Sequence, residues 1–192
     1  SGDVVVVKGK TVVPEEKKVY LAFNKPRGIV CTAEKREKNN VIDYLSYPVR
    51  IYPVGRLDKD SEGLLLMTND GAIVNGIMRA RNRHEKEYQV EVNKEITPEF
   101  LKEMASGVPI LDTVTRPCRI QKTGERSFMI ILTQGLNRQI RRMCEALGYR
   151  VTKLKRVRIM NIHLKDLKTG EYRPLTEKEL AELKKQIGEE KR

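Results

Sequence analysis

The residue of this chain best placed to take part in a reaction is Asp58. It stands in a charged loop bracketed by Gly55 and Gly63, and the apolar residues 64–67 that follow are typical of a short buried strand. Catalytic groups are commonly held on loops beside such rigid elements, which makes Asp58 a candidate catalytic carboxylate. By pattern alone, the structural alternative is favoured: a turn whose Asp side chain accepts hydrogen bonds from neighbouring backbone amides.

The other reactive residue types are sparse. His84 and His163 are the only histidines, which leaves little material for a His-based triad or metal site. Cys31, Cys118 and Cys144 are odd in number and show no metal-ligand spacing, so we expect no zinc site and free thiols in a reducing cytoplasm. No Walker-type glycine-rich loop supports a nucleotide cofactor. The chemistry that remains is that of carboxylates, tyrosines and many cations.

The charge of the chain points to a polyanionic partner. Among its 192 residues, 38 Lys and Arg stand against 26 Asp and Glu, which gives a net charge of +12. Nucleic acid and an acidic membrane surface both fit this charge. No apolar run approaches the roughly 20 residues that cross a bilayer, and residues 1–20 carry charges throughout, unlike a signal peptide. The membrane interpretation rests on charge alone, and we discount it.

Arginines are concentrated on one predicted helix, residues 137–148, with Asn137 as its cap and Gly148 at its end. One stripe of this helix is apolar, and a second stripe at i, i+3, i+4 and i+7 holds Arg138, Arg141, Arg142 and Glu145. A charged helix face is often only solvated. Three arginines offset by a single acid favour a bound ligand instead.

Residues 150–162 predict a strand with Arg156 and Arg158 on one face and Val157 and Ile159 on the other. Between residues 133 and 160, eight basic residues accompany one acidic residue. Such a stripe is typical of a phosphate-binding surface.

Two further segments carry candidate side chains. A helix predicted from residue 69 to about residue 80 ends among Arg79, Arg81, Arg83 and Lys86, which either complement the helix dipole or contact phosphate. Residues 87–92 alternate as a strand, with Tyr88, Val90 and Val92 on one side. By pattern alone, Tyr88 belongs to the core.

The remaining elements predict an α+β fold. Residues 19–24 and 29–32 are strand-like around a turn at 25–28, and residues 114–121 and 127–133 predict a hairpin. Thr97 and Pro98 begin a helix that Gly107 ends, and Thr176 with Glu179 forms a capping box before a final helix.

Two long motifs carry a family resemblance. Gly-Arg-Leu-Asp at 55–58, followed by Gly-Leu-Leu-Leu-Met-Thr-Asn-Asp-Gly at 63–71, resembles the catalytic motif of bacterial RNA pseudouridine synthases, although Ser61 replaces the more usual Thr. Residues 134–148, Gln-Gly-Leu-Asn-Arg-Gln-Ile-Arg-Arg-Met-Cys-Glu-Ala-Leu-Gly, together with Leu-Lys-Arg-Val-Arg-Ile at 154–159, are similar to the RsuA-type branch. That branch modifies ribosomal RNA, and its RluF-like members resemble this chain most. The similarity runs from about residue 4 to residue 175.

The resemblance implies the pseudouridine synthase fold, in which helices flank a long mixed, mainly antiparallel sheet. Residues 14–192 would form the catalytic domain, built as two half-domains with Asp58 in the cleft between them. From the sequence itself, we expect the chain to cross between the half-domains near residues 95–99. Residues 1–13 would be the tail of a small N-terminal S4-like RNA-binding domain, whose helices are missing here, or the edge of the expressed chain.

The resemblance also implies a reaction without metal, redox group or ATP, so we expect no cofactor. The enzyme breaks the N1–C1′ bond of uridine, turns the base and rejoins it through C5. Asp58 matches the essential carboxylate, which acts either as a nucleophile or as a base. Tyr88 matches the tyrosine that stacks on the uracil, Arg141 the cation that keeps the carboxylate negative, and Arg56 the arginine that enters the space left by the flipped base.

We therefore expect three groups of site residues. The catalytic residues are Asp58, Tyr88 and Arg141, and Leu154 or Val157 forms the apolar wall of the base pocket. The expected RNA-binding residues are Arg56, Asn137, Arg138, Arg142, Lys155, Arg156 and Arg158.

The expected partner is a stem–loop of large-subunit ribosomal RNA, with small-subunit ribosomal RNA or a tRNA anticodon arm as alternatives. We expect a cytoplasmic monomer that binds neither a membrane nor a small-molecule cofactor. A non-catalytic RNA-binding protein would explain the charge, but not the joint occurrence of Asp58 and Tyr88. A nuclease would need clustered metal ligands or a pair of histidines, which are not evident.

Overall fold

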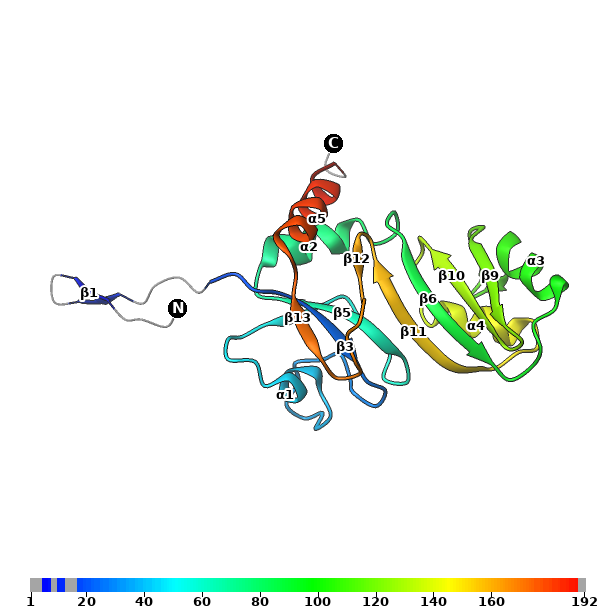
Figure 1. Ribbon diagram of the computed structural model, residues 1–192, viewed down its shortest axis with the longest axis horizontal. Helices are drawn as coiled ribbons and strands as arrows, with labels where there is room; N and C mark the ends of the chain where they lie inside the picture. Colours follow the sequence, from blue (N-terminus) through cyan, green and yellow to red (C-terminus); the bar gives the residue numbers. More distant parts are fainter. Residues whose placement is uncertain (1–4, 8–9, 13–16, 190–192) are drawn as a thin grey trace.

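The computed structural model describes residues 5–7, 10–12 and 17–189 (Figure 1). The expected N-terminal tail at residues 1–13 lies partly outside this range. Its described strands are β1 (Val5–Val7) and β2 (Lys10–Val12), which pair as a separate two-stranded sheet. None of the described helices is long and apolar enough to cross a membrane.

Five helices and eleven further strands make up the body of the chain. The helices are α1 (Val41–Leu45), α2 (Gly71–Arg79), α3 (Pro98–Ser106), α4 (Gln139–Ala146) and α5 (Glu177–Glu189). The strands are β3 (Tyr20–Lys25), β4 (Tyr52–Val54), β5 (Glu62–Thr68), β6 (Lys86–Val92), β7 (Pro109–Ile110), β8 (Thr113–Val114), β9 (Arg119–Gly124), β10 (Ser127–Leu132), β11 (Val151–Ile159), β12 (Ile162–His163) and β13 (Tyr172–Pro174).

Nine of these strands form one sheet in the order β13-β3-β5-β11-β6-β10-β9, with β4 paired to β5 and β12 paired to β11. The β5–β11 pair is parallel, and the other strand pairs of the sheet are antiparallel. The expected long mixed, mainly antiparallel sheet and the α+β class are therefore confirmed.

Three apolar clusters pack on this sheet. The first cluster lies between α3, α4 and the strands β6, β10 and β11. The second cluster lies under α2 and α5, and the third lies beside α1. Along β5, Leu64 and Leu66 enter the second cluster whereas Leu65 and Met67 enter the third, because successive strand side chains point to opposite faces. Helices α3 and α4 lie at one end of the sheet, and α1, α2 and α5 lie at the other (Figure 1). The first cluster and the other two therefore occupy opposite ends of the sheet.

The two ends of the sheet are joined by very few main-chain contacts. Only Lys155 with Glu62 and Arg156 with Gly63 are paired between β11 and β5. Gly63 has a φ of +109°, and a Cβ at this position would lie 2.2 Å from the backbone oxygen of Arg156. Glycine is therefore required where the two strands meet.

The chain passes from one end of the sheet to the other between Ile77, in the second cluster, and Val90, in the first. It returns along β11, where Leu154 packs in the first cluster and Ile159 in the second. The expected crossing at residues 95–99 falls inside the first cluster, because Ile96 is part of that core. We propose instead that the half-domains divide in the turn between α2 and β6.

The helix starts largely follow the expected capping chemistry. Thr97 accepts a hydrogen bond from Phe100 N at 3.1 Å, and Thr176 and Glu179 make the reciprocal capping box of α5. The expected Asn137 cap of α4 is wrong. Arg138 occupies the cap position with a φ of +49°, and the side chain of Asn137 accepts a hydrogen bond from Arg142 at 2.9 Å instead.

Candidate active site

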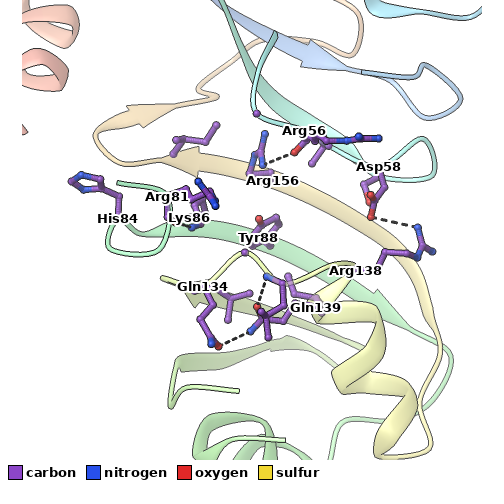
Figure 2. A pocket seen from close by; sticks show the side chains of 18 of the residues that line it. Arg56, Asp58, Arg81, His84, Lys86, Tyr88, Gln134, Arg138, Gln139 and Arg156 are labelled. Carbon is purple, nitrogen blue, oxygen red and sulfur yellow. Dashed lines mark hydrogen bonds and ion pairs between the residues drawn. The ribbon is translucent and has the colours of Figure 1, made fainter. Parts of the chain in front are cut away.

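A cavity of about 450 Å³ lies between the first and second clusters and has the size of a small-ligand site. Its walls take Leu132, Ile140 and Leu154 from the first cluster, and Val54, Ile77, Ile159 and Met160 from the second. Asp58 and Tyr88 both line it (Figure 2). We call this cavity the central pocket.

The loop that carries Asp58 is held at several points. Gly55 turns the chain after β4 with a φ of +77°, a conformation that suits glycine. Ser61 N donates to Asp58 O at 3.0 Å, which closes a turn, and Gly28 N donates to Lys59 O at 2.8 Å. Asp58 is therefore presented from a fixed loop just before β5, as its sequence position predicted.

Asp58 has a different ion-pair partner from the one we expected. Arg138 Nη1 lies 3.4 Å from Asp58 Oδ2, and the two side chains are each 38% exposed. The same guanidinium binds Asp60 through both terminal nitrogens, at 3.0 and 2.8 Å. Arg138 therefore links the two carboxylates.

Arg141 contacts the neighbouring residues of the loop instead. Its Nη1 lies 3.6 Å from Asp60 Oδ2, and its Nη2 donates to Asp60 O at 3.0 Å and to Ser61 Oγ at 3.2 Å. Burial lowers the pKa of Arg141, while the charges of Asp60 and Asp58 oppose that shift. Since arginine stays protonated in proteins, Arg141 adds positive charge beneath the loop without binding Asp58 directly.

Asp60 forms ion pairs with both Arg138 and Arg141, and its pair with Arg138 is shorter than the Asp58–Arg138 pair. The hydrogen bonds from Arg138, aided by the charges of Arg141 and Arg138, lower its pKa to about 2 despite partial burial. Asp60 pairs with both arginines, and Asp70 caps α2 by accepting from Ala72 N and Ile73 N.

The apolar side of the central pocket comes from β6 and β11. Tyr88 is half-buried on β6 and lines the pocket, and Leu154 lines it from β11. Val157, the alternative wall, packs against the second cluster and is not part of the pocket lining. Of the two candidates for the wall, the structure therefore places only Leu154 there.

Arg56 and Arg156 lie together in the pocket wall with different exposure. Arg56 is exposed. Arg156 is buried, and it donates to Leu64 O at 2.9 Å and to Arg56 O at 3.4 Å. Because its hydrogen bonds go to backbone carbonyls of both segments, Arg156 fixes the Asp58 loop against β5 (Figure 2).

The expected shared face of Arg156 and Arg158 is wrong. The register of β11 against β6 shifts between them, so Arg156 pairs with Tyr88 whereas Arg158 pairs with Glu87. Arg158 is consequently held by Glu87 at 3.2 Å and Glu85 at 3.0 Å. It lies on the sheet face opposite the central pocket.

Two more expected RNA-binding residues lie away from the central pocket. Lys155 pairs with Gln89 and lines a separate hollow on the outer face of the sheet. Arg142 donates to Asn137 O and Asn137 Oδ1, both at 2.9 Å, so it fixes the start of α4. Asn137 itself lines the pocket.

Several pocket residues were not among the expected site residues. Gln134 and Gln139 are hydrogen-bonded to each other at 3.3 Å, and Gln139 also accepts from Leu136 N at 3.1 Å. Lys86 lines the pocket two residues before Tyr88, on the same face of β6. Alternation along residues 86–92 was the signal that could have placed Lys86 there.

No group of three His, Cys, Asp or Glu side chains that could hold a metal ion is found within the described part of the chain. Cys144 is buried, and Cys31 and Cys118 are partly buried free thiols.

Comparisons with known proteins identify a family. A family model described as RNA pseudouridylate synthase matches residues 19–146. The dual-specificity RNA pseudouridine synthase RluF of Escherichia coli K12 is 53% identical over 188 residues, which cover 97% of this chain and 65% of that protein. The chain thus spans about two thirds of the length of this relative.

More distant relatives are also pseudouridine synthases. Ribosomal large subunit pseudouridine synthase B of Bacillus subtilis is 36% identical over 95% of this chain and 78% of its own length. A solved structure described as a pseudouridylate synthase matches with a TM-score of 0.80 at 30% identity, covering 90% of this chain and 76% of that one. This chain therefore belongs to the RNA pseudouridylate synthase family.

Proposed function

We propose that the chain converts a specific uridine of ribosomal RNA to pseudouridine. The observation that carries this proposal is that Asp58 and Tyr88, 30 residues apart in sequence, line one pocket of about 450 Å³ beside an exposed Arg56. A pure RNA clamp needs basic side chains, but not a carboxylate and an aromatic ring facing the same cavity.

The first step of the proposed reaction removes the uridine from its stack. Extrusion of a base costs a few kcal/mol, and less in a loop or bulge. Arg56 enters the space that the base leaves, because it is exposed while its main chain is fixed by Arg156.

The second step holds the base and breaks the glycosidic bond. Tyr88 stacks on the uracil, a contact worth roughly 1–3 kcal/mol, and Leu154 forms part of the apolar wall. The Asp58 carboxylate is oriented by Arg138 and attacks the nucleoside or removes a proton from it. The N1–C1′ bond breaks, the base turns, and a C5–C1′ bond forms. C5 loses its proton and N1 takes one up, so the overall change is an isomerisation.

The RNA class is proposed from the relatives. The names of the relatives include a dual-specificity RNA enzyme, a ribosomal large subunit enzyme and a ribosomal small subunit enzyme. We propose a stem–loop of large-subunit ribosomal RNA as the substrate, bound by a cytoplasmic monomer, without a cofactor.

The test compares wild type with Asp58→Asn on ribosomal RNA transcribed in vitro, which lacks modifications. Both proteins should bind, and only wild type should form pseudouridine, in the presence or absence of EDTA. Asp112→Asn is the matched control, because Asp112 is exposed in the turn between β7 and β8. Modification by Asp58→Asn would overturn the role of Asp58. If the wild-type protein binds RNA but forms no pseudouridine, the chain would be a non-catalytic RNA-binding protein.

A further inference from the structure

The two ends of the central pocket differ in charge balance. At one end, Arg138 and Arg141 are compensated by Asp58 and Asp60. At the other end, Arg81 and Lys86 line the pocket beside His84 (Figure 2). Within the described residues, neither Arg81 nor Lys86 has a carboxylate within ion-pairing distance.

The nearest acid in the sequence does not compensate this end. The carboxylate of Glu85 is held by Arg119 at 2.6 Å and by Arg158 at 3.0 Å. A second arginine, Arg116, adds to the positive charge, because its guanidinium donates to Asn82 O at 2.6 Å in the same turn. Cations that gather without acids favour an anionic ligand.

The hydrogen bonds of Lys86 leave room for such a ligand. An ammonium group has three donors. Lys86 Nζ donates to Arg81 O at 2.6 Å and to Thr133 O at 3.0 Å, so two donors tie the α2–β6 turn to the loop after β10. Among the described contacts the third donor has no acceptor, although Lys86 lines the pocket.

The electrostatics agree with the geometry. Burial, together with the charges of Arg156 and Arg116, lowers the pKa of Lys86 to about 8. An anion bound at this end would offset that repulsion. Arg81 is exposed, and its Nη1 donates to Met78 O at 2.8 Å, which fixes the guanidinium beside the pocket while leaving other N–H donors.

We propose that Arg81 and Lys86 bind a backbone phosphate of the RNA strand next to the extruded nucleotide. The site lies at the end of the pocket away from Asp58, so the strand would be held on both sides of the reacting base. This inference rests on the proposed function, because it takes RNA as the ligand.

The test measures binding of a large-subunit ribosomal RNA transcript as a function of salt concentration. Every protein carries Asp58→Asn, so no turnover occurs. Adding Arg81→Ala should weaken binding about tenfold at low salt and reduce the slope of log affinity against log salt by about 0.7 to 0.9, the value for one phosphate contact. Arg81→Lys should recover most of the slope. Lys86→Met should reduce the slope as Arg81→Ala does.

Arg126→Ala is the matched control, since Arg126 is exposed in the turn between β9 and β10, far from the pocket. It should leave the slope unchanged. An unchanged slope in Arg81→Ala, or an equal loss in Arg126→Ala, would overturn the proposal. Thermal unfolding of each variant establishes that it is folded.

A separate kinetic measurement distinguishes this inference from the proposed function. In protein that retains Asp58, Arg81→Ala should raise KM and leave kcat nearly unchanged. The reason is that the phosphate contact is equally strong in the bound substrate and in the transition state. If wild type forms no pseudouridine, the proposed function fails, whereas the salt slope still tests the phosphate site. If wild type is active and the slope does not respond to Arg81, only the phosphate site fails.

Discussion

Gly63 lies directly against the main chain of Arg156, where β5 and β11 form the parallel pair of the described sheet. Arg156 also donates to Leu64 O at 2.9 Å. The close approach and the side-chain hydrogen bond together fix the join between the two ends of the sheet, immediately behind the Asp58 loop.

We predict that Gly63→Ala destabilises the protein by more than about 2 kcal/mol, because the new Cβ meets backbone atoms and φ is +109°. Pseudouridine formation should also fall, since the loop shifts with β5. Thermal unfolding and an activity assay measure the two effects. Gly135→Ala is the stability control, because its Cβ meets nothing within 4 Å, and it should change stability by at most about 0.5 kcal/mol.

Arg138, at the cap position of α4, and Arg141, inside the helix, should give different results. Arg138→Ala should lower kcat with a stability change below about 1 kcal/mol, because the side chains in its ion pairs are 38–40% exposed. Arg141→Ala should lower both activity and stability, the latter by about 2–4 kcal/mol, because Asp60 O and Ser61 Oγ lose a buried donor. Urea unfolding and single-turnover kinetics separate the two. Equal stability loss in both variants would contradict the assignment.

Lys86 should make stability depend on alkaline pH. Its pKa is about 8 in the folded protein, against 10.5 as its ordinary value. Between these values the unfolded chain holds more protons than the folded chain, so wild-type stability should rise with pH in this window. Lys86→Met should lack this rise, as urea unfolding at pH 7.5 and pH 10 would measure. An identical pH dependence in the two proteins would contradict the low pKa.

Asp60 should also make stability rise with pH, but in the acid range. Its pKa is about 2, below the ordinary 3.8, so its ion pairs stabilise the folded state above pH 4 and are lost as pH falls towards 2. Asp60→Asn should therefore be less stable than wild type at pH 6, and the difference should shrink as the pH falls towards 2. A gap that stays constant over this range would contradict the prediction.

Local signals predicted much of the fold. Thr97 and the Thr176–Glu179 capping box mark helix starts whose hydrogen bonds the structure contains. These features depend on neighbours in sequence, so propensity and capping chemistry are enough to find them. The predicted Asn137 cap was wrong because the side-chain oxygen of Asn137 accepts a hydrogen bond from Arg142, five residues away, which competes with capping.

The site was harder to predict because its contacts depend on register and on distant segments. Strict alternation along β11 put Arg156 and Arg158 on one face, but one shift in register separates them. Similarly, the helix pattern gave no basis for choosing whether Arg138 or Arg141 reaches Asp58. The family motif located Asp58 and Tyr88, whereas three-dimensional packing decides their partners.

The contact between β5 and β11, which we call the seam, has only two paired residues on each strand, and this should affect how the protein unfolds on heating. The apolar clusters at the two ends of the sheet are each held by many buried side chains, while the seam behind the Asp58 loop has little main-chain pairing of its own. Partial opening on heating should therefore begin at this seam. Catalysis would then cease, reversibly, several degrees below the temperature at which the helices melt.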